Sequence, residues 1–304
     1  MKSLINYLLI DRIKITAANT VSSPITYGFP AISAFLGAIH ALNRELLEDW
    51  DITFDGVLIS CHECHIRSYR AHAFTDYTFN QNRTPLKQNG SAPSIIEEGK
   101  CDLTLSLAIK IYGEKSAHRR VNNEPETFKN RIQELLTAHR IAGGSVQGIR
   151  NLKLFGEEDF EELTTALMPA RVLMSAQDEL IAIEKSLKEQ NKTAQPLSTL
   201  IELATLHHNP TEDEQGKTTW ATETCKKGKG WLVPIPVGFQ AISRSFTPGE
   251  LANYRNPEYP SQYVESIYSA GKWILPHRGL DPKSCFWRYD NSQKHLYLVT
   301  QNNH

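Results

Sequence analysis

The sequence predicts an α+β fold whose first half follows the order of a ferredoxin-like unit. Residues 101–112 alternate between apolar and polar side chains, which is typical of a strand buried on one face. Residues 34–50 and 125–142 instead carry apolar residues at helical spacing. Together with two further extended segments, residues 1–145 give strand, helix, strand, excursion, strand and helix. That order matches most of a βαββαβ unit.

The first strand is predicted over residues 4–16, which begin apolar and then alternate at Ile13 and Ile15. A loop rich in Ser, Thr, Pro and Gly follows. Ser33 is positioned to cap the helix that covers residues 34–50.

A second strand is predicted over residues 52–66, and the polar segment 72–98 after it reads as a long hairpin or an extended excursion. The strand 101–112 and the helix 125–142 complete this half. We expect Gly143 and Gly144 to end that helix as a C-terminal cap.

Residues 157–206 carry an amphipathic helical pattern that is broken at Pro169 and Pro196. Residues 207–230 are polar and predict an exposed loop. Strand-like patterns return from Trp231 onward. We therefore expect a palm with an excursion, then a helical insertion, then strands that complete the palm: residues 1–150 with the excursion at 72–98, residues 151–230, and residues 231–304.

Composition argues for a cytoplasmic protein with no membrane partner. The five cysteines are scattered, and no apolar run approaches the roughly 20 residues that span a bilayer. The N-terminal segment lacks the features of a signal peptide. Lys plus Arg number 33 against 34 for Asp plus Glu, so the overall charge does not favour bulk nucleic-acid binding. A local basic groove remains open.

The stretch CHECH at residues 61–65 raises the question of a metal site. It directly extends an apolar run, so we expect a strand rather than the tight turn of a zinc knuckle. In a regular strand Cys61 and Cys64 point to opposite faces because their separation is odd. The only second set of ligands is His207 and His208 with Cys225, without a recognisable spacing. We expect no metal and no cofactor.

Other motifs leave alternatives open. Neither a nucleophile elbow nor a Walker phosphate loop is present. Gly143 and Gly144 could form a helix cap or a backbone cradle for phosphates. Glu97 and Glu98 do not define acid–base chemistry without a partner. Trp231, Trp273 and Trp287 are more typical of core or interface positions than of base-stacking platforms.

Several stretches, in order along the chain, resemble one family of CRISPR-associated proteins. They are SSPITYGFP running into AFLGAIHALNR, NQNRTPLKQNGS followed by IIEEGK, RIAGGS, GWLVPIPVGF, FTPGE and WILPHR. The family is the Csy-type, Cas-five-like subunit that caps the backbone of type I-F surveillance complexes. The resemblance runs from about residue 4 to residue 290 and is weakest over 157–230.

The resemblance implies a RAMP-type fold with a ferredoxin-like (RNA-recognition-motif-like) palm and a thumb. It also implies a non-catalytic role in gripping the 5′ repeat-derived handle of CRISPR RNA (crRNA). The implied partners are a large Cas-eight-like subunit, the Cas-seven-like backbone subunits and, through the assembled complex, target DNA.

Single-stranded RNA is recognised by aromatic stacking, by hydrogen bonds to base edges and 2′-hydroxyls, and by phosphate contacts. The loop 22–29 carries hydroxyl groups and aromatic rings. The excursion carries the cations Arg83 and Lys87 and the side-chain amide of Asn89. Two later segments, 140–145 and 277–278, match segments of the family. Family members often carry Trp where this chain has Tyr27. The expected RNA-binding residues are Ser22, Ser23, Thr26, Tyr27, Phe29, Arg83, Lys87, Asn89, Arg140, Gly143, Gly144, Ser145, His277 and Arg278.

The alternative is a metal-independent RAMP endoribonuclease that processes precursor crRNA. That chemistry needs a base near the 2′-hydroxyl. Tyr27, His40 and His277 are the candidates near the motif segments.

Overall fold

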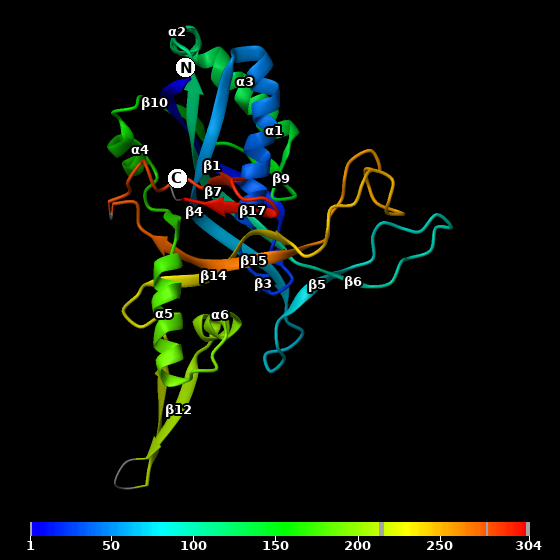
Figure 1. The fold of residues 1–304 in the computed structure, drawn as a ribbon, viewed down its shortest axis with the longest axis vertical. Coiled ribbons are helices and arrows are strands. Elements are labelled where there is room, and N and C mark those ends of the chain that lie inside the picture. The colour runs from blue at the N-terminus through cyan, green and yellow to red at the C-terminus, as the bar shows by residue number, and fades with distance from the viewer. Residues whose placement is uncertain (1, 213–215, 278, 302–304) are drawn as a thin grey trace. The chain divides into compact units, whose positions relative to one another are not determined.

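The computed structural model describes residues 2–212, 216–277 and 279–301, which form a mixed α+β fold with six helices among those residues (Figure 1). The predicted α+β class is confirmed. The chain divides into two compact units. Unit 1 comprises Met1–Arg171 and Leu275–Trp287, and unit 2 comprises Val172–Ile274 and Arg288–His304. No helix in the described part of the chain is long and apolar enough to cross a membrane.

Unit 1 begins with a long strand and alternates strands and helices up to a short fourth helix. Its elements are β1 (Ser3–Asn19), β2 (Val21–Ser23), β3 (Thr26–Tyr27), α1 (Ile32–Trp50), β4 (Ile52–Tyr69), β5 (Thr78–Asn82), β6 (Ile96–Glu98), β7 (Lys100–Gly113), α2 (Lys115–Asn123), α3 (Pro125–Ala138), β8 (Arg140–Ile141), β9 (Gly144–Gly148), β10 (Asn151–Phe155) and α4 (Phe160–Ala166).

The centre of unit 1 is an antiparallel sheet in which β7 lies between β4 and β1. The far edge of β1 pairs with β10 near Asp11 and with β9 near Thr16. The alternation of β7 explains its place, because Leu105, Ile109 and Ile111 are fully buried on one face. The strands predicted over 4–16, 52–66 and 101–112 are thus confirmed as β1, β4 and β7.

Helices α1 and α3 pack together through aromatic side chains, with the rings of Trp50 and Phe128 4.9 Å apart in an edge-to-face arrangement. Phe35 of α1 is also fully buried. Burying aromatic side chains of this size is a large share of the hydrophobic stabilisation of a helix. The segment 275–287 adds the buried Trp287, which exchanges two backbone hydrogen bonds with Val57 at 2.8 and 2.9 Å.

Unit 2 is built on an antiparallel sheet with strand order β11–β15–β14–β17–β16. Leu203 and Ile183 of its two helices pack with Leu232 and Ala270 of the sheet. The elements are β11 (Arg171–Ser175), α5 (Gln177–Gln190), α6 (Pro196–Ala204), β12 (His207–Glu212), β13 (Thr218–Glu223), β14 (Trp231–Ala241), β15 (Val264–Ile274), β16 (Arg288–Asp290) and β17 (Leu296–Thr300).

Some local predictions were wrong. The N-cap of α1 is Ala31 rather than Ser33, and it makes no side-chain capping bond. Helix α3 ends at Ala138, before the Gly-Gly pair. Residues 207–230 are exposed as predicted, but β12 and β13 form a hairpin in them. For the last two, the physical reason is that strand pairing supplies partners that the local sequence does not reveal.

Candidate nucleic-acid interface

Three segments that are distant in the sequence meet at the C-terminal end of β1. The backbone N–H of Asn19 donates to the carbonyl of Ala142 at 2.9 Å, which joins β1 to the β8–β9 turn. The N–H of Thr20 donates to the carbonyl of Gly99 at 3.1 Å, and the N–H of Gly28 donates back to the carbonyl of Thr20 at 2.9 Å. The loop 20–29, the Gly-Gly-Ser turn and the start of β7 are therefore one assembly.

The hydroxyls of the loop hold its shape. Ser22 Oγ lies 2.8 Å and Ser23 Oγ 2.6 Å from Thr26 Oγ1, and Ser23 Oγ also accepts the N–H of Thr26 at 3.0 Å. This network closes the β2–β3 hairpin. The hydroxyls of Ser22, Ser23 and Thr26 are therefore already partly used in hydrogen bonds within the loop.

The two aromatic residues of the loop have different surroundings. Tyr27 is 44% exposed, and its ring meets the ring of Phe79 edge to face at 4.6 Å. Phe29 is half-buried and stacks on Phe35 of α1 at 5.6 Å. Phe29 therefore anchors the loop to the helix, whereas Tyr27 presents an aromatic surface.

Tyr27 lines a cavity of about 600 Å³ at the base of the β5–β6 hairpin. The walls are mainly aromatic, with one aliphatic side chain, two aliphatic hydroxyls and one carboxylate. The lining residues are Tyr27, Ile66, Ser68, Tyr77, Thr78, Phe79 and Glu97. An apolar cavity with a few polar groups is the common form of a site for a small ligand. The sequence pattern did not predict that Tyr77 and Phe79 lie beside Tyr27.

The Gly-Gly-Ser segment is a strand turn, so the predicted helix cap was wrong. Arg140 pairs with Ser145 across the turn. Ala142 and Gly143 have φ values of 51° and 75° at its tip, as a tight hairpin turn requires. A Cβ on Gly144 would lie 2.6–2.8 Å from atoms of β1. The turn therefore packs closely against β1, with Arg140 and Ser145 exposed beside it.

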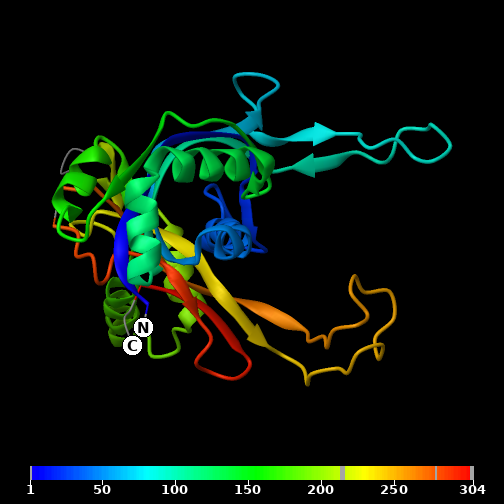
Figure 2. The same ribbon diagram turned by 90° about the horizontal axis from the view of Figure 1, so that it is seen from above.

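The excursion 72–98 is a hairpin that projects from unit 1 (Figure 2). Arg83, Lys87 and Asn89 are exposed on the segment that joins β5 to β6. Asn89 Oδ1 accepts hydrogen bonds from the N–H and the hydroxyl of Ser91 at 3.0 and 2.7 Å. Its amide oxygen therefore shapes the segment, and the two cations extend outward from it.

The remaining predicted residues lie elsewhere in unit 1. His277 is exposed in the segment 275–287, and Arg278 lies outside the described residues. His40 is exposed on α1. Among the described residues, no hydrogen bond or ion pair joins His40 or His277 to Tyr27.

The CHECH stretch lies in β4, as expected, but its cysteines share a face. A bulge between Cys61 and Glu63 shifts the register, so Cys61 pairs with Leu105 and Cys64 with Leu103. These partners are two residues apart on one strand, and the expectation of opposite faces was therefore wrong. Burial raises the pKa of the Cys61 thiol to about 12. The described residues contain no group of three or more His, Cys, Asp or Glu arranged to hold a metal ion.

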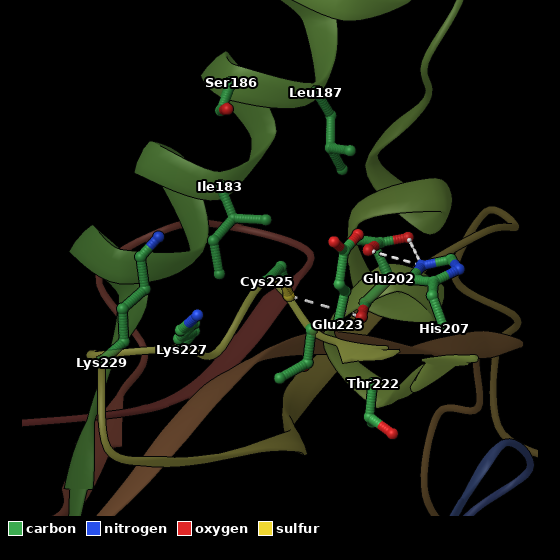
Figure 3. A pocket seen from close by; sticks show the side chains of 11 residues that line it. Ile183, Ser186, Leu187, Glu202, His207, Thr222, Glu223, Cys225, Lys227 and Lys229 are labelled. Carbon is green, nitrogen blue, oxygen red and sulfur yellow. Dashed lines mark hydrogen bonds and ion pairs between the residues drawn. The ribbon is translucent and has the colours of Figure 1, made fainter. Parts of the chain in front are cut away.

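Unit 2 has a separate cavity of about 390 Å³ between α5, α6 and the β12–β13 hairpin (Figure 3). His207 Nε2 lies 2.8 Å from a carboxylate oxygen of Glu202, and the Cys225 thiol donates to the Glu202 carbonyl at 3.4 Å. Lys227 and Lys229 line the opposite part of the cavity (Figure 3). His207 and Cys225, considered above as members of a second ligand set, thus contact Glu202, and these contacts join the hairpin and the segment after it to α6.

The sequence comparisons agree with the resemblance carried by the motif segments. The family described as CRISPR-associated protein (Cas_Csy2) matches residues 8–299. A relative from Pseudomonas aeruginosa (strain UCBPP-PA14), CRISPR-associated protein Csy2, is 32% identical over 310 residues, covering 95% of this chain and 93% of the relative. The match defines the class: the chain is a CRISPR-associated protein. Within that class it belongs to the Csy2 family.

Proposed function

We propose that the chain is a non-catalytic subunit of a type I-F Csy complex and that it binds the 5′ repeat-derived handle of crRNA. The observation that carries the proposal is the cavity of about 600 Å³ lined by Tyr27, Tyr77 and Phe79, next to the two loops that resemble the family's RNA-binding segments. Membership of the Csy2 family supports the assignment to this system.

The cavity suits an unstacked nucleobase. Aromatic side chains offer π surfaces on which any base can stack, and such stacking contributes about 1–3 kcal/mol per base. Ser68, Thr78 and Glu97 add groups that can bond to base edges. Arg83 and Lys87 on the exposed excursion are placed to contact phosphates. Recognition would therefore combine stacking near β1 with charge on the thumb.

We further propose that unit 1 is a ferredoxin-like RAMP palm, with residues 72–98 as its thumb. Its strands follow the order β10–β1–β7–β4 in an antiparallel sheet. Helix α1 connects β1 to β4, and α2 and α3 lie between β7 and β10. This topology supports the proposal, because it is the βαββαβ order read from the sequence.

The proposed partners follow from the family resemblance. They are the large Cas-eight-like subunit, with which the chain would hold the handle, and the Cas-seven-like backbone, which it would cap in the cytoplasm. With 33 basic against 34 acidic residues, the chain would leave most phosphate neutralisation to those subunits. Target DNA would be met only through the assembled complex.

The endoribonuclease alternative is not favoured. Its candidate bases were Tyr27, His40 and His277, and a proton-transfer pair must come within hydrogen-bond reach of one hydroxyl. Tyr27 packs against Phe79, and the two histidines are exposed on α1 and on the segment 275–287. We therefore assign RNA cutting to another subunit.

Binding of a handle RNA to purified Tyr27 variants tests this function. We expect Tyr27→Ala to raise the Kd about tenfold or more, because one stacking partner is lost. Tyr27→Trp should retain affinity, because the aromatic surface remains. Tyr259→Ala is the control, since Tyr259 is also an exposed tyrosine, 62% exposed against 44% for Tyr27, and lies in unit 2. Equal affinity of Tyr27→Ala and the control would refute the stacking site.

A further inference from the structure

Two β-bulges, one in each neighbouring strand, lie next to the middle of β7 near Ser106. In β1 the register with β7 shifts between Ile10 and Ile13, and Arg12 there has a φ of 49°. In β4 the register shifts between Cys61 and Glu63, at His62. Bulges are common next to functional sites because they redirect side chains, and a non-glycine residue at positive φ is uncommon.

The bulges bring three groups onto one hydroxyl. The backbone N–H of Arg12 donates to Ser106 Oγ at 3.0 Å, and Ser106 Oγ lies 3.1 Å from Asp11 Oδ1. His62 Nε2 lies 2.8 Å from the same Oγ. An ionised carboxylate only accepts, so the single Ser106 proton goes to Asp11. His62 Nε2 must therefore carry a proton and donate it to Ser106.

This arrangement fixes the role of the other ring nitrogen. Burial, then the charge of Arg12, lowers the pKa of His62 from its usual 6.5, against the opposing effects of Asp11 and Glu63, so the ring is mainly neutral at pH 7. A neutral ring protonated on Nε2 has its acceptor lone pair on Nδ1. Among the described residues Nδ1 makes no hydrogen bond, and His62 is only half-buried.

Ser106 is not arranged as a nucleophile. It is fully buried, and its proton points to Asp11 instead of to a histidine base. A serine activated for attack must instead donate to its base. The hydroxyl therefore positions His62 and does not react.

An exposed cation lies beside Asp11, the carboxylate that accepts from Ser106. The Arg150 side chain is 61% exposed, and its Nε is 3.9 Å from Asp11 Oδ2. The charge of Arg150 also acts on His62 and lowers its pKa. An acceptor nitrogen with a nearby exposed guanidinium matches the 2′-hydroxyl and the phosphate of one ribonucleotide, since the hydroxyl can donate and the phosphate accepts from arginine.

We propose that Asp11, Arg12, His62, Ser106 and Arg150, here called the His62 cluster, bind one ribose of an RNA strand. His62 Nδ1 accepts the 2′-hydroxyl, and Arg150 contacts the adjoining phosphate. The inference rests on the proposed RNA-binding function and gives it a position that distinguishes RNA from DNA. Asp11, Arg12 and Ser106 are positioning residues that hold the imidazole in its tautomer.

The test is a binding cycle between single 2′-deoxy substitutions and His62→Gln. The probes are the handle RNA that copurifies with the chain, made synthetically, and the same oligonucleotide with one 2′-deoxy residue at each position in turn. Glutamine can keep the N–H donor to Ser106 but lacks the ring Nδ1. We expect one 2′-deoxy position to weaken wild-type binding about fivefold, and His62→Gln to be insensitive at that position alone.

Arg150→Gln provides a second, exposed variant if His62→Gln folds poorly. Losing one phosphate contact should reduce the slope of log K against log salt by about 0.7. Arg119→Gln on α2 is the matched control, because Arg119 is also exposed and the charge change is the same.

The possible failures are distinguishable. If the wild type binds the handle but every 2′-deoxy position affects His62→Gln and wild type equally, and Arg150→Gln behaves as Arg119→Gln, the ribose site is refuted and the proposed function stands. If the wild type binds no handle RNA, the proposed function falls together with the site.

Discussion

Gly144 illustrates how a single residue constrains the proposed interface. A Cβ there would lie 2.6 Å from Ile15 Cγ2, 2.7 Å from the Thr16 carbonyl oxygen and 2.8 Å from the Ala18 nitrogen. Two of these neighbours are backbone atoms of β1, which cannot move aside independently. The glycine thus allows the β8–β9 turn to reach the loop 20–29.

We predict that Gly144→Ala lowers the free energy of unfolding by about 1–3 kcal/mol, the usual cost of overpacking. Gly148→Ala, at the other end of β9, is the control, because a Cβ there meets nothing within 4 Å. Urea denaturation of both variants measures the difference. Equal stability of the two would show that β1 and the turn are not in close contact.

The sequence shows which residue types are present near the proposed interface, but it does not show in which direction their side chains point. Tyr27 and Phe29 were both expected to offer stacking faces, yet Phe29 packs on Phe35 because α1 begins immediately after the loop. The orientation of His62 depends on a bulge, and a strict period of two cannot anticipate a bulge. The His62 cluster was missed for this reason.

At the scale of elements, the excursion between β4 and β7 was predictable because its polar, proline-containing sequence supports neither a helix nor a buried strand. The residue at which α3 ends was not predictable from the sequence. A Gly-Gly pair suits a helix cap and a hairpin turn equally well locally. The pairing of β9 with β1 decides between them, and that contact is remote in sequence.

The proposed thumb, residues 72–98, leads to a prediction at the scale of elements. We expect Arg83→Gln with Lys87→Gln to reduce the slope of log K against log salt for handle RNA by about 1.4, since each phosphate contact to a single strand contributes about 0.7. Both side chains are exposed, so thermal stability should not change. The control is Lys115→Gln with Arg119→Gln on α2, also exposed. An unchanged slope in the thumb variant would remove the thumb from the RNA interface.

At the scale of the whole molecule, the α+β class followed from periodicity, whereas the interleaving of the compact units did not. Residues 275–287 return to unit 1 after the strands of unit 2, and Trp287 is buried against Val57. Such a return is decided by tertiary packing, and composition along the chain carries no sign of it. The division into palm, helical insertion and C-terminal strands stays a prediction.

The net charge is likewise a property of the whole molecule. A balance of 33 basic and 34 acidic residues gives no overall attraction to RNA. The chain must therefore bind the handle through local contacts, while the partner subunits would neutralise most of the RNA charge in the complex.

The most direct measurement is to express the tagged chain with its operon neighbours and a CRISPR array, purify it, and sequence the RNA and identify the proteins that accompany it. We expect mature crRNA with one intact repeat-derived segment at its 5′ end, together with a large subunit. Recovery of the chain with neither that RNA nor those proteins would show that it is not a handle-binding subunit of such a complex.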